Sequence, residues 1–119
     1  MSAEDAAKWK GLAEQARAGD LYLDDEAVAR ECLKACTDRI ADLDEMLIQV
    51  RRTKVVSGFG DFVMAGDLTK KFAEQGADIE TSLLEHIETV KNMQEVMRLS
   101  ISKLVGQDVD NAGNIKATP

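Results

Sequence analysis

The chain has 119 residues, of which 45% are hydrophobic, 31% charged and 4% aromatic, and its single proline is the last residue. This length and composition are typical of one helical domain with a modest core. Against 22 acidic residues there are 15 basic ones, so the net charge is -7 and no basic run offsets it. Such a surface repels phosphate backbones, which argues against nucleic acid as a partner.

The sequence also bears on where the protein is made. No apolar run approaches the ~20 residues that span a bilayer. The N-terminus is acidic and alanine-rich, and lacks the basic and apolar regions of a cleaved signal peptide. We therefore expect a protein that is made in the cytoplasm and has no membrane span.

Three helices are expected in chain order. A short helix over residues 3–18 ends at Gly19, a residue type that suits a helix C-cap. Two long amphipathic helices follow over residues 24–56 and 67–105, because apolar residues recur there with the helical period.

The long helices carry acidic residues where a helix begins. Asp24 and Asp67 are the expected N-caps, since an aspartate accepts hydrogen bonds from the first free backbone N–H groups. Residues 106–119 have no periodicity and are expected to form a flexible tail. The predicted organisation is therefore one all-α domain over residues 1–105, followed by that tail.

Apolar residues alternate at spacings of three and four along both long helices, which is the pattern of a heptad seam. Folded back on each other, these helices are expected to form an antiparallel hairpin in which paired residue numbers total about 123. Ile40 then meets Leu83, and Leu33 meets Val90. The predicted seam comprises Ala29, Leu33, Cys36, Ile40, Leu43, Leu47 and Val50 on the first long helix, and Phe72, Gly76, Ile79, Leu83, His86, Val90, Met93, Met97 and Leu104 on the second.

Further apolar residues lie beside this seam, so two helices alone leave apolar surface uncovered. We expect the N-terminal helix and a second chain to cover it, in a four-helix bundle formed by a homodimer or by a heterodimer with a related helical protein. The expected partner interface comprises Met46, Ile48, Leu84, Ile87, Leu99 and Ile101, with Phe59 and Phe62 at the tip of the hairpin.

The connection between the long helices contains VVSGFGDF at residues 55–62. Glycines on either side of Phe59 permit the backbone angles of a sharp reversal. A phosphate-binding loop would need a preceding strand and either a Walker motif or GxGxxG, and this segment has neither. We interpret it as a turn whose phenylalanines offer an apolar tip to a partner.

Two similar long helices, joined by a glycine and aromatic turn at the middle of a short acidic chain, resemble the WXG (Esx-like) family of type VII secretion proteins. The resemblance covers residues 24–108. It implies a dimeric four-helix assembly, exported without a cleaved signal peptide by an ATPase-driven translocase of actinobacteria and related bacteria. It also implies contact with a secretion ATPase or chaperone.

The tryptophan motif of that family is placed differently in this chain. The family has Trp-x-Gly in the turn, where this chain has Phe59 between two glycines. A literal WKG occurs at residues 9–11, inside the short N-terminal helix, and is interpreted as coincidence.

The family's export signal is a tyrosine, three residues, and then an acidic residue, after the second long helix. At the matching place this chain has LVGQD, with Leu104 where tyrosine is expected and Asp108 as the acidic residue. A literal match, YLDDE, places Tyr22 and Glu26 before the hairpin instead. These four residues are the candidates for an export signal.

His86 is the single histidine and is expected on the seam opposite Cys36 and Thr37, with Cys32 one turn away. Three such ligands could bind zinc, and a thiol beside an imidazole could act as a nucleophile. Structural zinc usually takes four ligands, however, and a catalytic pair needs an orienting third group. We favour a core histidine bonded to Thr37 or to a backbone group, beside two free thiols, and predict no metal, no cofactor and no enzyme activity.

Two functions agree with these patterns. The favoured one is a non-enzymatic Esx-like protein that acts through protein–protein contact, as a secreted substrate or an accessory protein of a type VII secretion system. The alternative is a cytosolic helical adaptor or regulatory subunit that binds a partner helix and is not exported.

Overall fold

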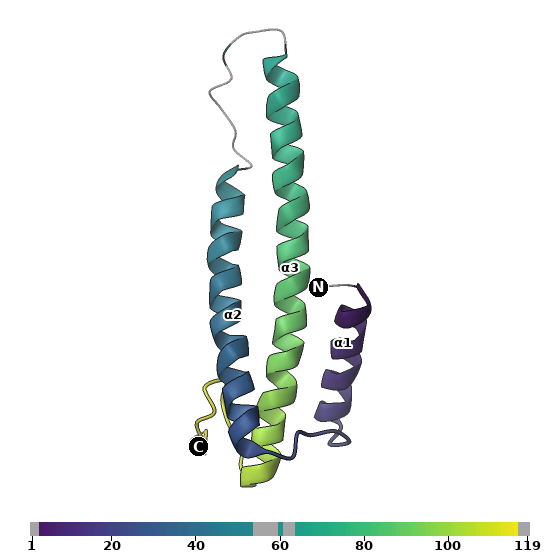
Figure 1. Ribbon diagram of the computed structural model, residues 1–119, viewed down its shortest axis with the longest axis vertical. Helices are drawn as coiled ribbons and strands as arrows, with labels where there is room; N and C mark the ends of the chain where they lie inside the picture. Colours follow the sequence, from purple (N-terminus) through teal and green to yellow (C-terminus); the bar gives the residue numbers. More distant parts are fainter. Residues whose placement is uncertain (1–2, 54–59, 61–63, 117–119) are drawn as a thin grey trace.

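The fold consists of three helices, seen in a computed structural model that describes residues 3–53, 60 and 64–116 (Figure 1). This confirms the predicted all-α fold with a short N-terminal helix and two long helices packed together. Each helix end lies within three residues of its predicted position. The helices are α1 (Ala3–Arg17), α2 (Glu26–Thr53) and α3 (Ala65–Val105).

Helix α3 lies between the other two helices (Figure 1). It packs against α2, which runs in the opposite direction, and against α1, which lies beside its C-terminal half. Over the described residues, α1 and α2 do not pack against each other. Helix α3 therefore carries two separate interfaces.

Both predicted N-caps lie one to three residues from the observed ones. The carboxylate of Asp25, and not that of Asp24, accepts a hydrogen bond from the backbone N–H of Val28 at 3.0 Å. Helix α3 is preceded by Met64, which makes no side-chain capping bond. Asp67 lies inside the first turn of α3, where its charge still interacts favourably with the helix dipole.

Glycines end two of the helices. Gly19 follows α1 with a φ of 80°, and Gly106 caps α3 with a φ of 74°. The backbone N–H of Gly106 donates to the carbonyl of Ser102 at 2.9 Å. Both residues adopt the left-handed conformation that favours glycine after a helix, and the prediction for Gly19 is confirmed.

The register of the α2–α3 hairpin differs from the predicted one. Gln94 donates to the hydroxyl of Thr37 at 3.1 Å, and Arg51 Nε lies 3.4 Å from Glu80 Oε1. Residue numbers in both pairs total 131, eight more than predicted. The prediction assumed a reversal that is symmetric about the turn, whereas α3 is much the longer helix and its first turns extend beyond the end of α2.

The core consists of three clusters of buried apolar residues along α3. The first joins the middle of α2 to α3, the second joins the start of α2 to the end of α3, and the third joins α1 to α3. Because of the register, Leu33 packs with Ile101 and not with Val90 as predicted. The clusters are Cys36, Leu43, Leu47, Ile87 and Val90; Ala29, Leu33, Ile101 and Val109; and Ala13, Ala16 and Val96.

Residues 106–116 fold into a small hairpin, where the sequence predicted a flexible tail. Val109 and Ile115 form an isolated antiparallel bridge, and Val109 is fully buried in the second cluster. At the turn, the carboxylate of Asp110 accepts hydrogen bonds from the backbone N–H groups of Ala112 and Asn114. We call this segment the C-terminal hairpin.

Polar contacts fix the C-terminal hairpin on both long helices. Arg30 of α2 donates to the carbonyl of Gly113 at 2.7 Å, and Arg98 of α3 donates to Asp108 Oδ1 at 3.0 Å. Periodicity could not reveal these contacts, because a single buried valine and bonds to distant residues hold the segment in place.

No helix in the described part of the chain is both long enough and apolar enough to cross a bilayer.

Candidate functional site

The residues predicted at the partner interface fall into two groups. Met46, Ile48 and Leu84 are exposed, at 44%, 47% and 44% of their surface. Ile87 and Ile101 are buried between α2 and α3, and Leu99 packs against the α1 cluster. This corrects the prediction for Ile87 and Ile101, which α2 covers. Leu99 is covered by the N-terminal helix, as the sequence led us to expect for part of this surface.

Phe59 and Phe62, which were predicted at the tip of the hairpin, lie outside the described residues. Beside the tip, Phe72 and Ile79 were expected on the buried seam but are 49% and 51% exposed. The last turn of α2 contacts α3 at Glu80. The first roughly four turns of α3 therefore extend beyond that contact, which explains the exposure of both side chains.

The cysteines and the histidine do not form a metal site in the described part of the chain. No group of three or more histidine, cysteine or acidic side chains there is placed to hold a metal ion. Cys32 and Cys36 are free thiols. Burial raises the pKa of the Cys36 thiol, and the neighbouring Cys32 raises it further. Partial burial lowers the pKa of His86, and the Arg39 cation lowers it further.

Thr37, a predicted partner of His86, has other partners. Its hydroxyl accepts a hydrogen bond from Gln94 at 3.1 Å and donates one to the carbonyl of Asn111 at 3.1 Å. Thr37 therefore joins α2, α3 and the C-terminal hairpin, and it is not bonded to His86.

The α1–α2 connection and the end of α3 lie at the same end of the molecule (Figure 1). The four candidate export-signal residues belong to these segments or follow them directly in the sequence. Tyr22 is 40% exposed, and its ring centroid lies 4.3 Å from Lys103 Nζ. Glu26 is exposed, and Leu104 is partly buried. The fold thus brings two segments 80 residues apart in the sequence to the same end.

The connection between α1 and α2 is fixed to α3 at this end. The backbone N–H of Leu23 donates to Ser100 Oγ at 2.8 Å, and Lys103 Nζ donates to the carbonyl of Gly19 at 3.2 Å. Ser100 is fully buried and donates to the carbonyl of Val96 at 2.7 Å. Tyr22 is therefore presented by an anchored segment.

Asp108 is exposed and lies between two cations. Arg98 Nη1 is 3.0 Å from Oδ1, and Lys116 Nζ is 3.3 Å from Oδ2. The hydrogen bond with Lys116 lowers the pKa of Asp108, and Arg98 lowers it further. The carboxylate is therefore held in its ionised form as part of the C-terminal hairpin.

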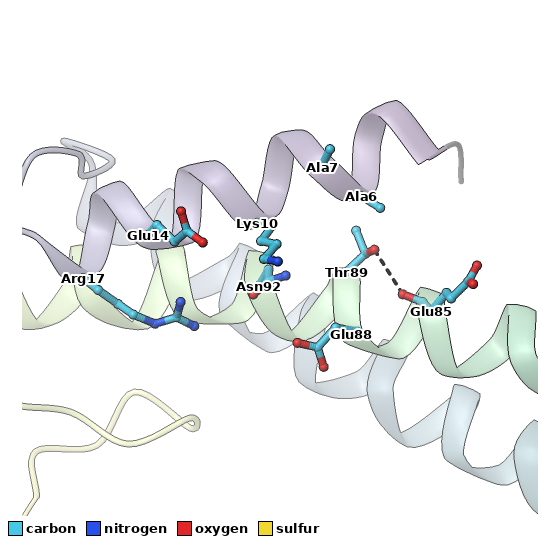
Figure 2. A pocket seen from close by; sticks show the side chains of 9 residues that line it. All are labelled: Ala6, Ala7, Lys10, Glu14, Arg17, Glu85, Glu88, Thr89 and Asn92. Carbon is cyan, nitrogen blue, oxygen red and sulfur yellow. Dashed lines mark hydrogen bonds between the residues drawn. The ribbon is translucent and has the colours of Figure 1, made fainter.

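A pocket of about 400 Å³ lies between α1 and α3 (Figure 2). Near the end of α1, Ala13 and Ala16 bring this helix against Val96 of α3. Nearer its start, Ala6 and Ala7 are too short to fill the space between the helices. The pocket is lined by Ala6, Ala7, Lys10, Glu14 and Arg17 of α1 and by Glu85, Glu88, Thr89 and Asn92 of α3.

Two buried polar residues of α3 form the inner part of the pocket. Thr89 is 3% exposed, and its hydroxyl donates to the carbonyl of Glu85 at 3.1 Å. Asn92 is 8% exposed, and its carboxamide makes no hydrogen bond with any described residue. Figure 2 shows this side chain beneath Lys10. The carboxamide is therefore available to a ligand.

Charged residues surround these two polar groups. Glu14, Glu85 and Glu88 are acidic, whereas Lys10 and Arg17 are basic. Arg17 also lies 3.9 Å from Glu95, outside the pocket. The described lining contains no cysteine, histidine or serine, so the groups present suit binding by hydrogen bonds and charge.

The pocket was not predicted from the sequence, although a signal was available. Glu85, Thr89 and Asn92 are spaced by four and three residues, so they share one side of a helix. These polar residues lie on the side of α3 that also carries the apolar residues facing α1. Such a mixed side indicates a second, less tightly packed interface. Small residues at matching positions of the N-terminal helix strengthen that signal.

A second, smaller pocket of about 290 Å³ lies between α2 and the C-terminal hairpin. Arg30, Lys34 and Thr37 line it from α2, and Asn111 and Ala112 line it from the hairpin. Two bonds hold the guanidinium of Arg30, one to Gly113 and one to Glu26. Arg30 therefore links α2 to the C-terminal hairpin.

Comparison of the chain with protein-family models, with curated proteins and with solved structures found no match.

Proposed function

We propose that this chain is a non-enzymatic, Esx-like protein that acts through protein–protein contact, as a substrate or an accessory protein of a type VII secretion system. The observation that carries the proposal is the exposure of large apolar side chains on both long helices. Met46 and Ile48 of α2 and Leu84 of α3 each leave over two-fifths of their surface uncovered. Exposed apolar groups of this kind favour association when they lie close together.

The shape of the molecule supports the same proposal. Its radius of gyration is 19.5 Å, and it measures 65 × 30 × 25 Å. A compact domain of this length would have a radius of gyration of about 13.5 Å. An elongated molecule buries little apolar surface for its size. It gains stability when a second elongated molecule packs along one side, as in a four-helix bundle.

The proposed interface includes Ile48 and Leu84. The contact between Arg51 and Glu80 sets the register, so these two residues lie at the same level of the hairpin. A partner helix packed against this part of the hairpin would contact both side chains. The partner is a second copy of this chain or a related helical protein.

Sedimentation of the purified chain tests this interface. We expect a dimer, and we expect the double variant Ile48→Asp with Leu84→Asp to weaken it by at least about tenfold, because two charges would enter an apolar contact. Val28→Asp is the matched control, since Val28 is equally exposed, at 43%, but lies at the other end of α2. A monomeric chain that associates with no related helical protein would contradict the proposed interface.

The export part of the proposal concerns Tyr22, Glu26, Leu104 and Asp108, which lie together at the anchored end of the molecule. Fractionation of the native host, with and without a working type VII ATPase, tests it. We expect the protein outside the cell only when the ATPase works, and we expect Tyr22→Ala to reduce its export. Equal retention in the cytosol under both conditions would favour the adaptor function, whose partner would then be sought by copurification.

A further inference from the structure

We propose that the pocket between α1 and α3 binds an extended, basic peptide segment of a partner protein. The inference rests on the proposed function in one respect, that the chain works by protein–protein contact. It adds a second contact, separate from the apolar surface around Ile48 and Leu84, and it names the chemistry of the segment that is bound.

The carboxamide of Asn92 is the first observation that points to a peptide. The residue is more than nine-tenths buried, yet its amide makes no hydrogen bond with any described residue. Asn92 lines the pocket, and Figure 2 shows its carboxamide on the side of α3 that faces α1. A carboxamide carries a donor and an acceptor side by side, which matches the N–H and C=O of a peptide backbone.

The charges around Asn92 set the preference for a basic segment. Glu14, Glu85 and Glu88 are among the residues that line the pocket, against Lys10 and Arg17. Three acidic groups therefore stand against two basic ones in the lining. Glu95 lies 3.9 Å from Arg17, but it pairs with Arg98 at 2.7 Å. The net charge of -7 on the whole chain adds long-range attraction for a basic partner.

The shape of the pocket suits a segment of chain. A volume of about 400 Å³ is within the range of ligand pockets. Ala6 and Ala7 line the pocket from α1, and Thr89 and Asn92 line it from the side of α3 that faces α1 (Figure 2). An extended peptide could place its backbone against Asn92 and its basic side chains against Glu85 and Glu88.

Titration of the full-length, ¹⁵N-labelled chain with N-acetyl-Lys-Ala-Lys-amide tests the proposal directly. We expect the side-chain NH₂ signals of Asn92 to shift and saturate, with a Kd of about 1 mM for so short a probe. The acidic probe N-acetyl-Glu-Ala-Glu-amide should cause no saturable shift. Equal binding of both probes, or no saturable shift with either, would overturn the proposal.

Two variants separate a specific site from general attraction to an acidic protein. We expect Asn92→Leu to weaken binding of the basic probe by about threefold to tenfold, because it removes both hydrogen-bonding groups at similar size. In the variants and the wild type alike, binding is followed by the backbone amide signal of Thr89, which lines the same pocket. Glu88→Gln should weaken it by about threefold, and the exposed Glu74→Gln, away from the pocket, should leave it unchanged. Glu88 is exposed, so this variant keeps the proposal testable if Asn92→Leu does not fold.

Failure of this inference can be told apart from failure of the proposed function. If Asn92→Leu and Glu88→Gln both bind the probe as the wild type does, the pocket is wrongly assigned, whatever the oligomeric state. If the pocket binds the probe but Ile48→Asp with Leu84→Asp has no effect on association, the apolar interface is wrong and the peptide site stands.

Discussion

The two interfaces of α3 differ in the size and polarity of the side chains that they bury. Toward α2, α3 buries Ile87, Val90 and Ile101 against large apolar side chains such as Leu43. Toward α1, the buried contacts are mostly alanines, and polar residues lie beside them in the pocket. One helix thus has one side that holds the fold together and another that leaves polar groups available for binding.

The difference in side-chain size predicts a difference in stability. Full burial of a leucine contributes about 1.5–3 kcal/mol, whereas each buried CH₂ group contributes about 0.8 kcal/mol. Contacts through Ala13 and Ala16 therefore stabilise less than contacts through Leu33 and Leu43. We expect α1 to separate from α3 before the α2–α3 hairpin unfolds, since locally weaker regions open first.

The largest expected effect comes from a cavity in the α2–α3 interface. Leu43 is fully buried in the first core cluster. Leu43→Ala should lower the free energy of unfolding by about 2–5 kcal/mol, because it removes buried methyl groups and leaves a cavity. Urea denaturation followed by circular dichroism at 222 nm measures this change.

Leu84→Ala is the matched control for that prediction, since the same side chain is lost from a position that is 44% exposed. Its effect on the isolated chain should stay below about 1 kcal/mol. Equal losses from the two variants would mean that Leu84 is as well covered as Leu43 in solution. That result would point to a dimer already formed at the concentration of the experiment.

A smaller effect is expected from crowding the α1–α3 interface. Ala13 is fully buried against α3, so Ala13→Leu should cost about 1–3 kcal/mol through overpacking. The cost should fall on α1 alone. Trp9 packs in the same cluster, and its fluorescence should shift to longer wavelength as α1 separates and the ring becomes hydrated.

Ala3→Leu serves as the control for α1, because Ala3 is exposed at the start of the same helix. It should leave the Trp9 emission unchanged. The urea midpoint of the α2–α3 hairpin should also stay the same in Ala13→Leu. If that midpoint falls together with the Trp9 signal, the three helices unfold as one unit and the proposed difference between the interfaces is wrong.

The long helices could be predicted from the sequence because the apolar period repeats along both of them. Their ends were close for the same reason, and Gly19 was correctly placed by its chemistry. The register was not predicted, because heptad patterns permit several offsets and the point of chain reversal had to be assumed. Leu33 was therefore paired with Val90 instead of Ile101.

The second side of α3 was harder to predict from the sequence. Leu99 and Ile101 are apolar residues beside the predicted seam. Leu99 packs against the α1 cluster, whereas Ile101 packs against Leu33 of α2 and Val109 of the C-terminal hairpin. Periodicity describes one helix at a time and could not supply those contacts, nor the pocket that α1 and α3 form together.

The smallest expected effect concerns the C-terminal hairpin, a third contact that depends on charge more than on burial. The pKa of Asp108 is lowered by Lys116 and by Arg98, so the folded chain binds a proton at this carboxyl less readily than the unfolded chain does. The stability that Asp108 contributes is fully present above the ordinary pKa of an aspartate. It is lost as the pH falls through the lower pKa of the folded state, below about pH 4.

Chemical shifts of Val109 and Ile115, measured by NMR as the pH is lowered, test this expectation. In the wild type they should move toward random-coil values in acid, while the signals of Leu43 and Val90 in the apolar core between α2 and α3 stay constant. Asp108→Asn should show part of that movement already at neutral pH, and Asp67→Asn, a remote change in the first turn of α3, should behave as the wild type. Unchanged Val109 signals in Asp108→Asn would show that burial of the valine alone holds this hairpin. The C-terminal hairpin would then depend on apolar packing, as the contact between α2 and α3 does.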